Sequence, residues 1–337
     1  MKRRLTVITA GPYTSIQDQG RTGNQALGVP EGGVLDREAM ALGNALVGNS
    51  ADAAVLECCM GGLRMRLDSA ARIALTGTVE GVLIIETAHG SSLKVPSGRS
   101  IDLAAGRVIQ LPPMPDSNTA TLALSGGIET APVYGSRGTT PNVRIGGLDG
   151  NLLADGDILP LGQPVAIAEG EMQLATTDIF LKRQTIRLVL GPQEDRFTDA
   201  GIETLTTHPY KLSPVLNRMG MRLVGPILEH EDGADILSDG IVSGSVQVPG
   251  DGKPIILLAD HQSTGGYTKI ATVISADLPA LARLQPADEI RFIAISAEEA
   301  VSVAREQQSR LDSLLASMQS ASALFDLDAL YSLGDTT

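Results

Sequence analysis

The chain has 337 residues, 43% of them hydrophobic and 19% charged, so it is long enough for two domains and too apolar to be disordered. Its formal net charge is −13, and it contains no Trp, five Tyr and four Phe. This acidic balance and the few aromatic residues argue against nucleic-acid binding, which draws on basic contacts to phosphates and on stacking platforms for bases. Two adjacent cysteines, Cys58 and Cys59, lie in an apolar run, which predicts buried thiols rather than a disulfide framework or a metal clip.

The N-terminal sequence MKRRLTVITAGPY is basic, but only a five-residue run rich in β-branched residues follows it. That run is too short for the apolar core of a signal peptide. No segment approaches the ~20 apolar residues of a membrane span. We therefore expect a soluble, cytoplasmic protein that does not associate with a membrane.

Short β-type segments separated by turn signals recur along the whole chain. In the first half they cover residues 5–9, 63–67, 72–76, 82–86, 108–111 and 119–124. In the second half they cover residues 186–190, 221–224, 242–248, 255–259, 272–275 and 290–295. Breakers such as Gly-Gly and Pro-Gly-Asp-Gly lie between them, a pattern typical of an all-β sandwich or barrel. The long helices that a parallel α/β sheet requires between its strands are not found.

Few helices are expected. One covers residues 36 to about 47, where Asp36 can cap the first turn and Gly48-Asn49 ends the last. A short helix follows Asp277, with Pro279 tolerated in its first turn. The pattern therefore places only short helices between the strands.

The clearest helix covers residues 297–319 and is followed by a tail at 320–337. Ser296 and Glu299 form a capping-box pattern at its start. An apolar stripe along this helix predicts packing on its own domain or on a partner. Residues 320–337 have the pattern of a loosely held C-terminal segment.

A polar, charged stretch at residues 168–184, AEGEMQLATTDIFLKRQ, lies between two strand-rich halves. It predicts three parts: an N-terminal β-rich lobe at 1–180, a C-terminal β-barrel lobe at 181–300, and a C-terminal helix and tail at 301–337. The expected fold is therefore mainly β, with few short helices.

Several chemistries can be excluded by spacing. VPGDGKPI is not a phosphate loop, because Gln247 stands where the first glycine belongs and Pro254 follows the lysine. No G-x-S-x-G elbow occurs. The histidines show no zinc-ligand spacing, so no metal site is expected; they are His89, His208, His230 and His261.

Three segments contain more hydrogen-bonding groups than a connection requires. They are residues 15–49, residues 133–150, and the run LLADHQSTGGY at 257–267, which is followed by Lys269. In each segment, the alternative is that these groups only brace the backbone. The residues considered for ligand binding are Asp18, Arg21, Asn24, Arg137, Asn142, Arg218, Gln262, Gly265 and Gly266.

Seven ordered blocks in these segments and around them carry a family resemblance. They are SIQD with GR at 15–21, LGVP at 27–30, ALVGN at 45–49, NRMG at 217–220, SDGI at 238–241, QVPGDG at 247–252 and TGGY at 264–267. The chain resembles, from about residue 5 to 300, the family of allophanate hydrolase subunit 2. That family is also called the biotin-dependent carboxyltransferase-like family.

The resemblance implies two cyclophilin-like β-barrel lobes and a role inside an enzyme complex. The chain looks most like the C-type component of an ATP-dependent 5-oxoprolinase, which opens the lactam 5-oxo-L-proline to glutamate with B-like and A-like partners. ATP would then be bound or supplied by the complex. One alternative is a carboxyltransferase component acting on urea or a related amide, with carboxybiotin on another chain. Another is a non-catalytic regulatory protein that binds its partners.

Lactam opening needs donors aimed at the carbonyl oxygen, and the segment at 261–269 offers them. Backbone N–H groups of Gly265 and Gly266 could act with Thr264, Tyr267 and Lys269, because glycine lets the backbone approach a ligand. His261 is a candidate acid or base near neutral pH. Forked hydrogen bonds to a substrate carboxylate could come from Arg21, Arg137 and Arg218.

Three positions depart from the pattern of relatives of the C type. Asn217 replaces an expected acid, Asn151 stands in the place of an arginine, and His261 occupies a position that we associate with arginine. Loss of a fixed positive charge predicts a change in how a substrate carboxylate is handled. The departures are compatible with a different lactam or amide, or with a non-catalytic relative.

Overall fold

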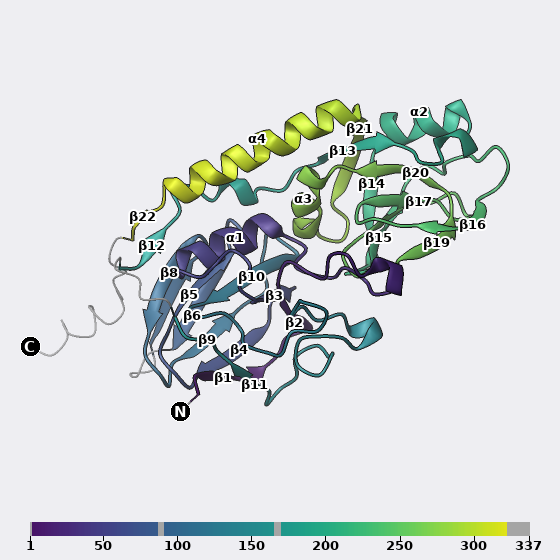
Figure 1. Cartoon of the computed structure of the whole chain (residues 1–337). Helices are drawn as coiled ribbons and strands as arrows, with labels where there is room; N and C mark the ends of the chain where they lie inside the picture. The colour runs from purple at the N-terminus through teal and green to yellow at the C-terminus, as the bar shows by residue number, and fades with distance from the viewer. Residues whose placement is uncertain (1, 87–90, 165–169, 322–337) are drawn as a thin grey trace, which may run out of the picture. The chain divides into compact units, whose positions relative to one another are not determined.

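The computed structural model describes residues 2–86, 91–164 and 170–321. Within this part of the chain the protein is mainly β, as predicted, with twenty-two strands and four α-helices (Figure 1). The chain divides into two compact units. Unit 1 consists of Met1–Gln19, Asp36–Leu181 and Ser313–Thr337; unit 2 consists of Gly20–Leu35 and Lys182–Asp312.

This division follows contacts rather than chain order. The change of unit after Leu181 falls inside the polar stretch that the sequence predicts as a boundary. The segment Gly20–Leu35 belongs to unit 2 although it precedes most of unit 1 in the sequence. Most of the expected tail, residues 322–337, lies outside the described residues.

Unit 1 contains two sheets whose strands are paired antiparallel. The six-stranded sheet has the order β11 (Ile158–Pro160), β1 (Arg4–Thr9), β4 (Leu63–Leu67), β9 (Val108–Leu111), β6 (Val82–Glu86) and β7 (Ser92–Pro96). The seven-stranded sheet has the order β2 (Tyr13–Gln17), β3 (Val55–Cys59), β10 (Thr119–Leu124), β5 (Ala71–Thr76), β8 (Arg99–Leu103), β12 (Met172–Gln173) and β22 (Gln319–Ser320). Side chains such as Leu5, Met65, Ile73 and Leu122 form one buried core.

Helix α1 (Arg37–Leu46) packs on the seven-stranded sheet of unit 1. It begins as predicted, because the Asp36 carboxylate accepts a hydrogen bond of 2.9 Å from the Ala39 N–H. The Thr76 hydroxyl of β5 donates to the Ala39 carbonyl at 2.7 Å. A methyl group on Gly43 would lie 2.9 Å from Thr76 Oγ1, so glycine allows the close approach of helix and sheet.

Unit 2 is a closed seven-stranded barrel. Its order is β13 (Thr185–Leu190), β20 (Lys269–Val273), β17 (Ser245–Gln247), β18 (Ile255–Leu257), β15 (Gly220–Val224), β14 (Tyr210–Asn217) and β21 (Glu289–Ala294). Parallel pairing of β13 with β21 closes it. Core side chains, such as Leu188, Val246, Ile256 and Phe292, are almost wholly buried. The resemblance implies two barrel lobes, whereas the described part of unit 1 forms two sheets.

Three further α-helices lie between or after the barrel strands. Helix α2 (Asp199–Thr207) is absent from the prediction; its cap is Thr198, whose hydroxyl accepts from Gly201 N–H at 3.0 Å. Helix α3 (Leu278–Arg283) has Pro279 in its first turn, as predicted.

The described residues also contain five short 3-10 turns. They are η1 (Gln25–Leu27), η2 (Pro141–Val143), η3 (Asp178–Phe180), η4 (Glu194–Arg196) and η5 (Ser275–Asp277).

The C-terminal helix α4 (Ala297–Ala316) begins with the predicted capping box. Ser296 N–H donates to Glu299 Oε2 at 2.8 Å, and Glu299 N–H donates to Ser296 Oγ at 3.1 Å. Its apolar stripe is less covered than expected, since Val301 is half exposed and Leu314 is the buried member. No helix in the described ranges is long and apolar enough to cross a membrane.

Residues 264–267 correct one expectation from the sequence. The Gly-Gly pair suggests a loop between two strands, but Thr264–Tyr267 forms strand β19. It pairs antiparallel with β16 (Asp235–Gly240) in a two-stranded ribbon of unit 2. The local glycine signal favours a turn, and pairing with a segment some 24 to 32 residues earlier in the chain decides for a strand.

Candidate functional site

Unit 2 contains a buried ammonium group paired with an exposed carboxylate. Lys269 opens strand β20 and is 2% exposed, and its Nζ donates to Asp239 Oδ2 at 2.7 Å. The Asp239 side chain is 53% exposed. The hydrogen bond from Lys269, with help from the Gly240 N–H, lowers the pKa of the Asp239 carboxyl. The carboxylate of this pair is therefore reached from the surface of unit 2, whereas the ammonium group lies beneath it.

Gln193 holds both partners of this pair in position. Its Oε1 accepts from the Lys269 backbone N–H at 3.0 Å, and its Nε2 donates to Asp239 Oδ2 at 3.2 Å. Its own N–H donates to the Lys269 carbonyl at 3.1 Å. The sequence pattern does not single out Asp239 or Gln193. The SDGI block contains Asp239, but nothing local in the sequence points to Gln193.

A buried amide lies beside Lys269 without a hydrogen-bond partner. Gln247 on β17 is 3% exposed, and its Nε2 has no partner in the described structure. In the barrel register Gln247 pairs with Lys269 on β20. A methyl group on Gly265 would lie 2.6 Å from Gln247 Nε2, so the ribbon strand β19 packs directly on this amide. A buried donor left unpaired is unusual and favours a ligand acceptor.

His261 lies in the turn that precedes β19 and is fully buried. Its Nδ1 is 2.5 Å from the Gln262 carbonyl oxygen, and its Nε2 has no partner in the described structure. The side chains of Gln262, Thr264 and Tyr267 are exposed. Lys269 therefore contacts the ribbon through Asp239, which pairs with Gly265, while the side chains of Thr264 and Tyr267 are exposed on the ribbon.

Arg218 is buried and makes an internal ion pair. Its Nε and Nη2 donate to the two carboxylate oxygens of Asp260 at 3.0 and 2.9 Å, and Nη2 also donates to the Gly33 carbonyl at 2.7 Å. Both side chains of the pair are at most 2% exposed. The guanidinium of Arg218 already binds Asp260 and Gly33. This geometry matches the structural alternative given above, in which the side chain braces the backbone.

The segment 20–35 contributes two predicted residues to unit 2. Arg21 is 1% exposed, and its backbone N–H donates to the Glu31 carbonyl at 2.7 Å. Asn24 lies near the surface, and its side chain donates to the Thr22 carbonyl at 3.2 Å. Both interactions shape the loop in which they occur.

Asp18 and Arg137 meet in unit 1. The Asp18 carboxylate accepts from the Arg137 N–H at 2.5 Å and from the Ser136 hydroxyl. The Arg137 guanidinium lies 3.2 Å from Glu129, and its Nε is buried without a partner in the described structure. Asp18 therefore holds the start of the polar segment 133–150.

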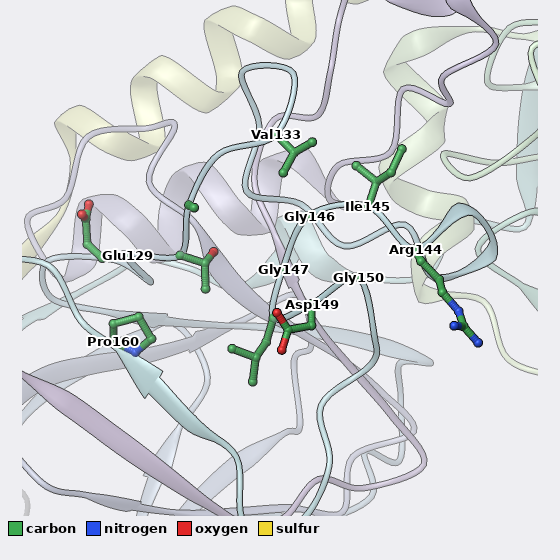
Figure 2. A pocket seen from close by; sticks show the side chains of 12 residues that line it. Glu129, Val133, Arg144, Ile145, Gly146, Gly147, Asp149, Gly150 and Pro160 are labelled. Carbon is green, nitrogen blue, oxygen red and sulfur yellow. The ribbon is translucent and has the colours of Figure 1, made fainter.

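The same segment lines a cavity of about 600 Å³ in unit 1. Figure 2 shows Asp149 among the lining glycines, with Arg144 pointing away from it. Thr130 also lines the cavity, and its buried hydroxyl has no partner in the described structure. Gly147 lies against Thr139 Oγ1, which leaves no space for a side chain. The lining residues are Glu129–Ala131, Val133, Arg144–Gly150 and Pro160.

The predicted residues therefore fall into two sets. Unit 1 holds Asp18 and Arg137, together with Asn142 on the exposed turn η2, which is close in sequence to the cavity lining. Unit 2 holds the set around Lys269, with Arg218 in its internal ion pair. Within the described residues, which leave out His89, no group of His, Cys, Asp and Glu could hold a metal ion.

Comparison of the whole chain with known proteins shows its family. The family model described as carboxyltransferase domain, subdomain A and B, matches residues 27–294. The chain belongs to this family.

Its similarity extends along almost the full length of particular relatives. The chain is 37% identical over 310 residues to the C subunit of 5-oxoprolinase from Escherichia coli, covering 92% of this chain and 97% of that protein. It is 31% identical over 310 residues to the C subunit of 5-oxoprolinase from Haemophilus influenzae, again covering 92% and 97%.

Solved structures show the same fold as part of longer chains. The Kluyveromyces lactis urea amidolyase matches with a TM-score of 0.85 and 26% identity, covering 97% of this chain and 21% of that one. The structure of TTHA0988 matches with a TM-score of 0.75 and 30% identity, covering 87% and 56%. The fold thus occurs both as a separate chain of this size and inside longer proteins.

Proposed function

We propose that the protein is the C-type component of an ATP-dependent 5-oxoprolinase, which opens 5-oxo-L-proline to glutamate together with B-like and A-like subunits. The observation that carries this proposal is the near-full-length similarity to the C subunit of 5-oxoprolinase. The 37% identity extends over 310 residues, which is 92% of this chain and 97% of that relative. ATP is bound or supplied by the assembled complex.

The geometry around Lys269 supports the chemistry that this proposal requires. When a lactam carbonyl is attacked, negative charge develops on its oxygen, and a buried ammonium group stabilises that charge strongly because water does not screen it. Lys269 is the buried cation, and Gln247 offers an unpaired amide donor beside it. Asp239 binds the ammonium group, and Gln193 holds the Lys269 backbone and the Asp239 carboxylate.

The other predicted residues take supporting parts in this proposal. Thr264 and Tyr267 lie on the exposed side of the ribbon and contact the substrate or a partner chain. His261 remains a candidate acid or base through its unpaired Nε2. The polar segment of unit 1, with Arg137 and the cavity beside it, is a second place for a polar ligand.

Reconstitution tests the proposal directly. The purified chain is mixed with its B-like and A-like counterparts, and ATP hydrolysis and glutamate release are measured with and without 5-oxoproline. We expect hydrolysis stimulated by 5-oxoproline, stoichiometric glutamate, and loss of both when this chain is omitted. A complex that forms and is indifferent to 5-oxoproline would refute the proposed substrate and turn attention to Asn151, Asn217 and His261.

A second function is favoured by the similarity to urea amidolyase. In that case the chain is a carboxyltransferase component acting on urea or a related amide, with carboxybiotin on another chain. Transfer of labelled carboxyl from a carboxybiotinyl protein to urea, dependent on this chain, would distinguish it from lactam opening. Binding to the partners without either activity would leave a regulatory binding role.

A further inference from the structure

The ammonium group of Lys269 is covered by the two-stranded ribbon of β16 and β19. Asp239 of β16 lies over it, with its Oδ2 2.7 Å from Lys269 Nζ, and the lysine side chain is only 2% exposed. In this arrangement the ammonium group is not accessible to a ligand. The proposed function requires a ligand oxygen to contact Lys269, so the Asp239 carboxylate has to leave it first.

The same ribbon covers a second donor. Gly265 of β19 packs on the side chain of Gln247, because a methyl group on this glycine would lie 2.6 Å from Gln247 Nε2. That nitrogen is buried and has no partner in the described structure. Asp239 pairs with Gly265 in the ribbon, and Gln247 pairs with Lys269 in the barrel. Two paired residues of the ribbon thus cover two paired donors of the barrel.

The ribbon is an element that can open separately from the barrel. Its two strands form a sheet of their own beside the closed barrel (Figure 1). Their pairing is irregular between Asp235 and Asp239, and every residue of β16 except Ile236 is exposed. An isolated two-stranded ribbon is only marginally stable, and segments with little buried surface are those that open locally. Opening of the ribbon should therefore cost less free energy than unfolding of the barrel.

Asp239 indicates which chemical group the covered donors bind. Its Oδ2 accepts from Lys269 Nζ at 2.7 Å and from Gln193 Nε2 at 3.2 Å, so two donors converge on one anionic oxygen. Its Oδ1 accepts from the N–H of the next residue, Gly240, at 2.8 Å. Another anionic oxygen in the place of Oδ2 would keep the buried ammonium group paired. Such a replacement avoids the large cost of leaving a buried charge without its partner.

We propose that an anionic oxygen of the ligand displaces the Asp239 carboxylate from Lys269, with Gln247 as a further donor, and that the ribbon lifts to admit it. In the free chain, Asp239 occupies the position of the ligand oxygen. That oxygen belongs to a carboxylate, or to a lactam carbonyl that becomes negative when it is attacked. The inference rests on the proposed function for the choice of 5-oxoproline, which contains both groups.

Ligand binding by the full-length chain tests the displacement. Dissociation constants are measured by NMR titration at neutral pH with 5-oxoproline, with cyclopentanecarboxylate, which has only the carboxylate, and with 2-pyrrolidone, which has only the lactam. Asp239→Asn removes the competing charge and keeps the shape of the side chain. Asp251→Asn is the matched control, because Asp251 is a half-exposed partner of Arg222 elsewhere in unit 2. We expect Asp239→Asn to tighten 5-oxoproline binding about tenfold and the control to stay within about twofold, because apparent affinity rises with the fraction of open chain.

A second variant tests the covered amide. Gln247→Leu, made in the Asp239→Asn chain, removes a buried donor that has no partner in the described structure. The variant should therefore melt at the same temperature as its parent or higher, as measured by circular dichroism. Its affinity for 5-oxoproline should fall about tenfold, since a hydrogen bond to a charged group is lost. Unchanged affinity would overturn Gln247 as a donor, and with it the lifting of β19.

The outcomes separate this inference from the proposed function. If none of the three compounds binds more tightly to Asp239→Asn than to the unchanged chain, Asp239 is a positioning residue and the displacement is overturned. Tightening with cyclopentanecarboxylate assigns the oxygen to the ligand carboxylate, and tightening only with the two lactams assigns it to the carbonyl. If binding tightens as expected but the reconstituted complex does not turn over 5-oxoproline, the displacement stands and the proposed function fails.

Discussion

The Lys269–Asp239 pair joins a nearly buried ammonium group to a half-exposed carboxylate. Ion pairs at the surface contribute little to stability because water and salt screen them. A pair held at the start of a barrel strand by a third side chain, Gln193, is better explained by binding than by stability. At the residue scale, the proposed function therefore centres on Lys269.

Replacing Lys269 with Met should lower 5-oxoproline turnover by the reconstituted complex about 10²- to 10³-fold, because a donor to the developing oxyanion is removed. Lys253→Met is the matched control, since Lys253 is exposed in the hairpin of the same unit. Steady-state kinetics of glutamate release measure the effect. Equal rates for the two variants would exclude Lys269 from the chemistry.

The same substitution should raise the pKa of Asp239, which the hydrogen bond from Lys269 lowers in the native chain. A carboxyl whose folded pKa lies below its unfolded pKa keeps its interaction at all higher pH values and loses it as pH falls through the folded pKa. The Lys269–Asp239 pair should therefore persist at neutral pH and open only in acid. Carbon-13 NMR titration of the Asp239 carboxyl, with and without Lys269→Met, measures this shift.

The Arg218–Asp260 pair is structural, and its loss should be costly. Asp260→Ala leaves the Arg218 guanidinium buried without its carboxylate, which typically costs about 3–5 kcal/mol of unfolding free energy. Asp251→Ala removes a half-exposed partner of Arg222 and should cost less than about 1 kcal/mol. Urea unfolding of both variants compares them; similar midpoints would contradict the internal role of Arg218.

At the scale of elements, the ribbon β16–β19 makes different demands on its two glycines. A methyl group at Gly265 would lie 2.5 Å from Ile241 Cδ1 and 2.6 Å from Gln247 Nε2, whereas at Gly266 it would lie no closer than 3.6 Å to any atom, an ordinary contact. Gly265→Ala should therefore displace Gln247 and cost about 1–2 kcal/mol, while Gly266→Ala should be nearly neutral. Thermal unfolding and turnover of the two single variants test the difference; a reversed order would refute it.

Elements also show which local signals are reliable. Caps at Asp36 and Ser296 predict where α1 and α4 begin, because a capping side chain satisfies N–H groups of its own helix. Helix α2 escapes prediction although Thr198 caps it, since its nine residues are short and mixed in polarity. Strand β19 escapes because its partner β16 lies far away in the sequence.

At the scale of the whole molecule, the segment Gly20–Leu35 should unfold with unit 2. Its Gly32 N–H donates to the Ala259 carbonyl at 2.9 Å, and its Gly33 carbonyl accepts from Arg218. Asp260→Ala should therefore reduce hydrogen-exchange protection of Gly32, while the Met40 amide of α1 keeps its protection. Equal loss at both amides would show that the two units unfold as one.

The sequence by itself determined the mainly β class, most strand positions, two capped helix starts and the family. These follow from alternation, capping and ordered motif blocks, which are local and therefore readable along a chain. Only the tertiary structure decided that Asp239 and Gln193 contact Lys269, that Arg218 forms an ion pair with Asp260, and that Gly265 packs on Gln247. Those partners are separated by 18 to 76 residues along the chain, and only barrel closure and strand register bring them together.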